Sequence, residues 1–120
     1  MFETKIDQAK NSLTLRYLRR IEPDEAKRFA EQFPNLLLEL RPGFSLLTDM
    51  SDLEFMHVDC VPYIKTVMDL CNQKKISTVV RIVPDPRKDI GFNILSLFHY
   101  DRGVRIITCQ TLDEALKLLQ

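Results

Sequence analysis

The chain has 120 residues, with 17 basic and 17 acidic side chains and a formal net charge of zero. This balance provides no overall field to attract nucleic acid or an anionic membrane surface, so neither is expected as a partner. Hydrophobic residues make up 45% and charged residues 28% of the chain, which is ordinary globular usage. The length predicts one domain over residues 1–120, large enough to bury a core.

The chain has three cysteines, Cys60, Cys71 and Cys109, and no two of them have C-x-x-C spacing. A disulfide framework or a zinc site is therefore not expected, and the two histidines are too far apart in sequence to suggest a metal site. The first residues lack the apolar segment of a signal peptide, and no apolar run reaches the roughly 18 residues that span a membrane. We expect a cytoplasmic protein with no cofactor.

The amino-terminal part predicts a hairpin followed by a helix. Residues 2–6 and 12–19 alternate apolar and polar side chains, as half-buried strands do. Pro23 and the two acidic residues after it are typical of a helix start. Apolar residues then recur at helical spacing up to Leu40. Pro34 is expected to kink this helix or divide it in two.

The rest of the chain alternates strands and helices. Strands are expected over residues 44–49, 76–83 and 104–109, and helices around 61–71, after Asp89 and after Thr111. Thr111 and Glu114 have the spacing of a capping box, and Leu112, Ala115, Leu116 and Leu119 are expected to be buried. Because long crossovers make successive strands parallel, the predicted class is α/β. We expect a mixed five-stranded sheet with an antiparallel amino-terminal hairpin, mainly parallel remaining strands and about four helices.

One charged residue, Arg81, interrupts an apolar strand. With Ser45, Ser77 and Arg105 it is assigned to the more polar face of the sheet, so helical cover is expected to be uneven. Three roles stay open for Arg81: an ion pair with a neighbour such as Glu39 or Asp49, extension to the sheet edge, or binding of an anionic ligand.

In parallel α/β sheets, ligands bind beyond the carboxyl ends of the strands. Those ends carry Asp49, Ser51, Asp52, Asp85, Arg87 and Thr111. Ser51 and Glu54 repeat the capping-box spacing, so Ser51 is interpreted as a helix N-cap and not as a nucleophile. His99 is expected at the opposite rim from Asp49, which argues against a catalytic triad. The sequence also has no glycine-rich phosphate loop and no H-E-x-x-H motif, so no enzyme activity is expected.

The segment Leu46-Leu-Thr-Asp-Met-Ser51 resembles the strand ending of STAS domains of bacterial anti-sigma-factor antagonists. In that family an edge hairpin precedes a strand that ends in Asp-Leu-Ser, and some relatives have a lipid-carrier-like fold. The resemblance implies a STAS-like domain that regulates by binding another protein, such as a kinase-like regulator or a component of a sigma-factor pathway. The family's phosphorylatable serine lies at the following helix start, where this chain has His57, Val58, Asp59 and Cys60.

The predicted interaction surface therefore joins the strand end to the helix start: Asp49, Ser51, Asp52, His57, Asp59 and Cys60. Asp59 is interpreted as the N-cap of the helix, with Pro62 in its first turn. The alternative is that Asp59 stands for a permanently charged phosphoserine. A catalytic Cys60–His57 couple is not expected, because nothing else marks Cys60 as activated.

Two further alternatives stay open. A small apolar or amphipathic ligand is one, because large apolar side chains are dense around Phe92, Leu95, Leu97 and Phe98. A homodimer is the other, because the amino-terminal hairpin is expected to be a sheet edge, and edges invite pairing unless they are charged.

Overall fold

A computed structural model describes residues 1–85 and 100–118 of the chain. Five strands form one sheet in the order β1-β2-β3-β4-β5. Their bounds are β1 Phe2–Asp7, β2 Ser12–Ile21, β3 Ser45–Met56, β4 Thr78–Ile82 and β5 Arg105–Cys109. β1 pairs antiparallel with β2, and every later pair is parallel. The predicted mixed sheet is confirmed.

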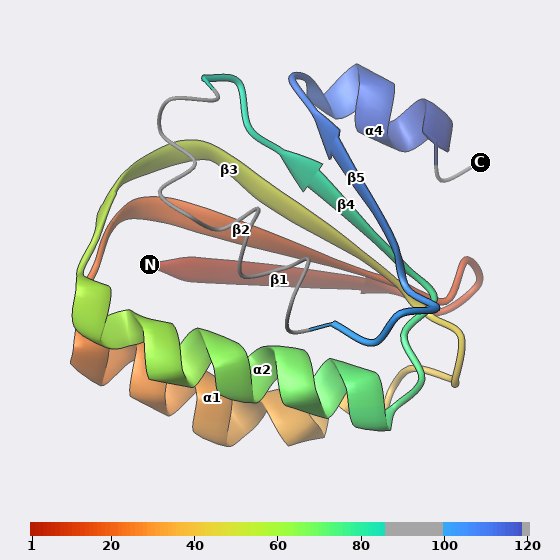
Figure 1. Cartoon of the computed structure of the whole chain (residues 1–120), viewed down its shortest axis with the longest axis horizontal. Coiled ribbons are helices and arrows are strands. Elements are labelled where there is room, and N and C mark those ends of the chain that lie inside the picture. Colours follow the sequence, from red (N-terminus) through yellow and green to blue (C-terminus); the bar gives the residue numbers. More distant parts are fainter. Residues whose placement is uncertain (86–99, 119–120) are drawn as a thin grey trace.

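Three α-helices lie in the described residues: α1 Pro23–Leu37, α2 Val61–Gln73 and α4 Leu112–Leu118. A short 3₁₀ helix, η1 Val58–Cys60, leads into α2. About four helices were predicted, and the one expected after Asp89 lies outside the described residues. α1 and α2 run side by side across one face of the sheet, and α4 lies on the other face (Figure 1). The expectation of uneven helical cover is confirmed for these helices.

The larger part of the core lies between the sheet and the α1–α2 layer. α1 contributes Ala26, Ala30, Phe33 and Leu37, spaced so that one face of the helix is buried. Pro34 lies inside α1, which continues through it, so of the two predicted outcomes, a kink or a division, the division is wrong. Pro34 is exposed, so its ring lies away from the core and the apolar face of the helix stays intact.

A smaller apolar cluster lies on the opposite face, beneath α4. It contains Leu47, Val80, Ile82, Cys109 and Ala115. Ala115 is the one buried residue within α4, whereas Leu112 and Leu116 are 47% and 45% exposed. The prediction that both leucines are buried is therefore wrong, and Leu119 lies outside the described residues.

The predicted capping box at the start of α4 is confirmed in part. The Glu114 backbone N–H donates to the Thr111 hydroxyl oxygen at 3.2 Å. The Glu114 carboxylate accepts a hydrogen bond from the Thr111 hydroxyl at 3.4 Å, whereas a full box would use a backbone amide.

Replacement of Pro34 by alanine is expected to raise the free energy of unfolding by about 1–2 kcal/mol. Proline in a helix interior costs ~3 kcal/mol of stability relative to alanine. The unfolded chain of the variant has more conformational entropy, which offsets part of the stability gained by removing the proline. Urea unfolding at constant m-value measures the change. Asn35→Ala, also exposed in the same turn, is the control and should change stability by less than about 0.7 kcal/mol. A less stable Pro34→Ala protein would contradict the interpretation.

Candidate interaction surface

β3 extends beyond the rest of the sheet. Its pairing with β4 ends at Asp49, opposite Ile82, whereas its pairing with β2 continues to Met56, opposite Ile21. β2 and β3 curve together toward the starts of α1 and α2 (Figure 1). The prediction that this strand ends at Asp49 is therefore wrong, because residues 50–56 remain part of β3. We refer to residues 17–21 and 50–56 as the β2–β3 extension.

Arg16 brings two of the predicted site residues together. Its guanidinium nitrogens lie 3.6 Å from Asp49 Oδ2, 2.7 Å from Asp52 Oδ2 and 3.2 Å from Glu3 Oε2. Glu3, Arg16 and Asp49 form one row across the paired strands β1, β2 and β3. Partly exposed ion pairs of this kind contribute at most ~1 kcal/mol each to the stability of the fold. The main effect of the cluster is therefore to hold these charged side chains in defined positions.

Ser51 is an exposed strand residue and caps no helix, which corrects the predicted N-cap. Its backbone N–H donates to Asp49 Oδ1 at 2.9 Å. Ser51 and Asp52 line an open surface groove of about 520 Å³ together with Arg19. Arg19 has a φ of 57°, and the β2–β3 register shifts between Arg19 and Arg20. Such bulges re-aim side chains, which is consistent with Arg19 lining the groove.

The three remaining predicted residues lie at the tip of the extension. His57 caps η1, since its Nδ1 accepts a hydrogen bond from the Asp59 backbone N–H at 3.0 Å. The prediction that Asp59 is the N-cap is therefore wrong, although Pro62 does lie in the first turn of α2. Asp59 is exposed, and its Oδ2 is 3.5 Å from His57 Nδ1. Cys60 is fully buried, and its Sγ donates to the Ile21 carbonyl at 3.5 Å.

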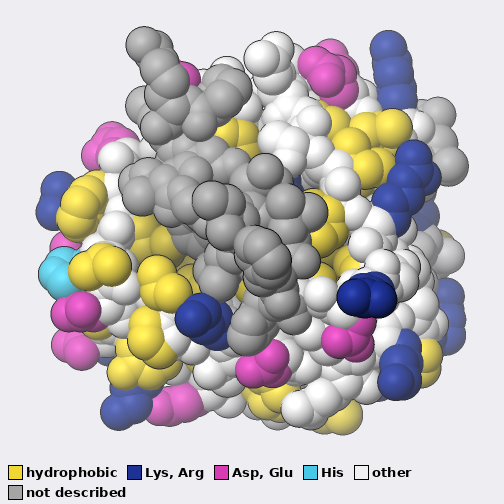
Figure 2. Space-filling view, in the orientation of Figure 1, with side chains coloured by type: hydrophobic (Ala, Val, Ile, Leu, Met, Phe, Trp, Pro, Cys, Tyr) yellow, Lys and Arg dark blue, Asp and Glu magenta, His cyan; other side chains and the backbone are white. Residues whose placement is uncertain are grey.

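Two exposed apolar side chains complete this tip. Phe55 is 39% exposed and Val58 is 74% exposed. The Arg20 guanidinium carbon lies 4.5 Å from the centre of the Phe55 ring, and the His57 ring meets that ring edge-on at 6.5 Å. Figure 2 shows hydrophobic side chains beside acidic ones and a histidine at the end of the molecule where β3 leads into α2. Sequence reasoning missed Phe55 and Val58. The alternation Asp52-Leu53-Glu54-Phe55 was the available signal for Phe55.

The thiols offer no activated nucleophile. Burial raises the pKa of the Cys71 thiol to about 12, and burial is also the main cause of the raised pKa values of Cys60 and Cys109. All three thiols are therefore neutral near pH 7. The residues that the structure describes also contain no group of three or more His, Cys, Asp or Glu side chains that could hold a metal ion.

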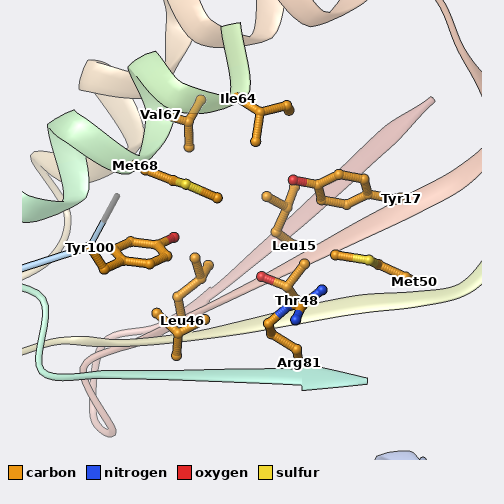
Figure 3. Close-up of a pocket in the computed structure, with 11 residues that line it drawn as sticks. Leu15, Tyr17, Leu46, Thr48, Met50, Ile64, Val67, Met68, Arg81 and Tyr100 are labelled. Carbon is orange, nitrogen blue, oxygen red and sulfur yellow. The ribbon is translucent and has the colours of Figure 1, made fainter. Parts of the chain in front are cut away.

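Arg81 is buried on the face of the sheet toward α2, with 1% of its surface exposed. It is opposite Thr48 in the β3–β4 pairing and on the other face from Ser45, so its predicted placement on the polar face is wrong. Extension to the sheet edge, one of the three roles left open, is excluded by its burial. Arg81 lines a cavity of about 20 Å³ together with Tyr17, Thr48 and Tyr100 (Figure 3). A cavity of this size has room for about one water molecule, so no larger anion fits beside Arg81.

No family model matches the chain, and no curated protein matches it. Solved structures do match it over almost its whole length. A DUF3478-family protein with a SpoIIAA-like fold from Shewanella loihica has a TM-score of 0.74 at 12% identity, covering 100% of this chain and 93% of that one. The Bacillus cell-fate determinant SpoIIAA, in its phosphorylated form, has a TM-score of 0.67 at 12% identity, covering 100% of both chains.

A putative anti-sigma factor antagonist from Thermotoga maritima has a TM-score of 0.64 at 20% identity, covering 99% of this chain and 94% of that one. At these identities the likeness establishes the fold. The chain has a SpoIIAA-like fold, and the resemblance to STAS-like domains is confirmed at that level. Among the described residues, no helix is long and apolar enough to cross a membrane.

Alkylation should leave the folded protein unmodified at about pH 8, because the raised thiol pKa values keep all three cysteines protonated. In denaturant all three should react with iodoacetamide, and intact mass spectrometry counts the added groups. Rapid modification of Cys60 alone in the folded protein would show an activated thiol and revive the Cys60–His57 hypothesis.

Stability should fall as the pH rises above about 10. Burial raises the pKa of Tyr17 and of Tyr100, so the unfolded chain releases these protons at a lower pH than the folded one. Above the unfolded pKa each such tyrosine removes ~1.4 kcal/mol of stability per pH unit, up to its folded pKa. Urea unfolding from about pH 9 to pH 11 should therefore give a shallower decline for Tyr17→Phe than for the unmodified protein. Equal slopes would contradict this origin of the decline.

Proposed function

We propose that residues 1–120 form a STAS-like regulatory domain that binds another protein and catalyses no reaction. The observation that carries this proposal is the exposed apolar pair Phe55 and Val58 at the tip of the β2–β3 extension. Two proteins of similar structure, an anti-sigma factor antagonist and a putative anti-sigma factor antagonist, support a regulatory role. The partner is a kinase-like regulator or another component of a sigma-factor pathway.

The tip has the layout of a protein-binding surface. Phe55 and Val58 provide an apolar centre, and Arg20, His57 and Asp59 surround it with charged or polar groups. Interfaces commonly combine an apolar centre with a polar rim, and aromatic and arginine side chains are enriched among the residues that dominate binding. Ser51 and Asp52 lie further along the extension, and Asp49 lies just before it. All three would contact a partner that also covers the groove beside Arg19.

The tip is also ordered before any partner arrives. The His57 cap fixes η1, and the His57 backbone N–H donates to the Ile21 carbonyl at 3.2 Å, which ties the end of β3 to the end of β2. Cys60 adds its bond to the same carbonyl, from the core side. Less conformational entropy is lost on binding when the contact residues are already fixed.

Partner binding at this tip is not switched by phosphorylation of the helix start. Residues 57–63 contain no serine or threonine. The first serine or threonine in α2 is Thr66, and its hydroxyl donates to the Pro62 carbonyl at 3.1 Å. Asp59 instead gives this position a permanent negative charge. A phosphoserine would carry a charge that a kinase adds and a phosphatase removes.

Val58→Asp should weaken partner binding at least about tenfold, because it puts a charge at the apolar centre of the contact. The domain is first immobilised to capture binding proteins from its source organism, and the dissociation constant of each captured protein is then measured. Leu38→Asp is the matched control, since Leu38 is 78% exposed at the far end of α1.

Leu38→Asp should leave the dissociation constant within about twofold, and both variants should keep the thermal stability of the original chain. Binding retained by Val58→Asp and lost by Leu38→Asp would place the interface elsewhere. If no protein bound with a measurable dissociation constant, the proposed function itself would fail.

A further inference from the structure

A second groove, of about 210 Å³, lies on the face of the sheet that carries α4. α4 packs against β4 and β5, and the groove lies beside it over β1, β2 and β3. Three hydroxyl side chains line it. Ser12 and Ser45 are opposite each other in the β2–β3 pairing, and Thr14 is two residues further along β2 on the same face.

These hydroxyls are half-buried, and no described residue of the protein is their hydrogen-bond partner. Within residues 1–85 and 100–118, no side-chain hydrogen bond is made by Ser12, Thr14 or Ser45. Each hydroxyl can donate one hydrogen bond and accept two. Three such groups converging on one groove can bind a polar ligand group that has several oxygen atoms.

The charge in the groove favours an anion. Lys5 and Lys10 both line it, and neither ammonium group forms an ion pair within the described part of the chain. Asp7 is the one acidic residue of the lining, and its Oδ1 accepts a hydrogen bond from the Lys10 backbone N–H at 3.1 Å. The lining therefore carries a net charge of about +1 near neutral pH.

The loop that carries Lys10 is held in place. The Asn11 side chain accepts a hydrogen bond from the Arg41 backbone N–H at 2.8 Å and donates to the Arg41 carbonyl at 3.1 Å. Arg41 Nη1 also donates to the Gln8 carbonyl at 3.3 Å. The cationic end of the groove is thus ordered without a ligand, which lowers the cost of binding one.

The other walls of the groove are apolar. Leu47 lies at its base and is 3% exposed, and Leu116 of α4 lines its side and is 45% exposed. An exposed leucine beside unused hydroxyls and two ammonium groups matches a ligand with an apolar chain and an anionic end. Such a ligand would cover Leu116 while its oxygens satisfied the hydroxyls.

We propose that this groove binds a small amphipathic anion, with its carboxylate or phosphate at Lys5, Lys10 and the three hydroxyls and its short apolar chain over Leu47 and Leu116. The volume of about 210 Å³ is below the ~300–1,000 Å³ of pockets for drug-sized ligands, which limits the ligand to one short, unbranched apolar chain. The site is separate from the tip of the β2–β3 extension and does not depend on the function proposed for that tip.

The test is a titration followed by amide NMR shifts of Thr14, Ser45 and Leu47, with four probes: octanoate, octyl phosphate, inorganic phosphate and octanol. The proposal expects saturable shifts at these amides with octanoate or octyl phosphate, and whichever of the two binds more tightly identifies the head group. Octanol, which lacks the charge, and inorganic phosphate, which lacks the chain, should each bind at least about tenfold more weakly.

Lys5→Gln/Lys10→Gln should raise the dissociation constant of the tighter probe about tenfold or more, and Leu116→Gln should raise it about threefold or more. Lys27→Gln/Lys65→Gln is the matched control, with the same charge change at exposed positions on α1 and α2. No saturable shift with either amphipathic anion would overturn the proposal. Equal weakening in the control pair, or inorganic phosphate as tight as octyl phosphate, would overturn it as well.

Discussion

The parallel pairing of β2 with β3 is the interaction on which the rest of the structure depends. β3 is the middle strand of the sheet, and its side chains alternate between the two apolar clusters. Leu46 belongs to the cluster under α1 and α2, whereas Leu47 belongs to the cluster under α4. Because β2 remains paired after β4 has ended, the same two strands also support the surface at the tip. A slip of β2 by one residue against β3 would reverse the faces of β2 and turn Arg16 toward the core under α1 and α2.

Much of the fold could be predicted because local patterns and tertiary packing agree. The alternation in residues 12–19 and the capping residues around Thr111 each specify one structure, and the long crossovers require parallel strands. Arg81 was misplaced because its charge was taken to indicate the polar face. The strand instead places it opposite Thr48, among apolar side chains and two tyrosines. A single charge is a weak guide to orientation when the strand pairing determines which way a side chain points.

The candidate surface could be predicted only in part. Asp49 and Asp52 belong together as expected, but the residue that joins them is Arg16, which is distant in sequence and carried no signal of its own. The N-cap of the helix was assigned to Asp59, whereas the N-cap position of α2 is Cys60, with no side-chain cap, and His57 caps the 3₁₀ helix that precedes it. The strand was expected to end at Asp49 because its apolar run stops there. The pairing with β2 overrides that expectation and carries β3 to Met56.

The direction of β2 and β3 has a consequence for how the molecule responds to two binding events. Both strands begin at the groove that Ser12 and Ser45 line, and both end at the tip where Ile21 meets Met56. The two sites are therefore separated by the length of β3, on the order of 35 Å along the chain. A small anion and a protein bound at the two proposed sites would therefore not compete sterically. Any influence of one binding event on the other would have to be transmitted along the strands. The domain would then combine two signals, because binding at one site would not exclude binding at the other.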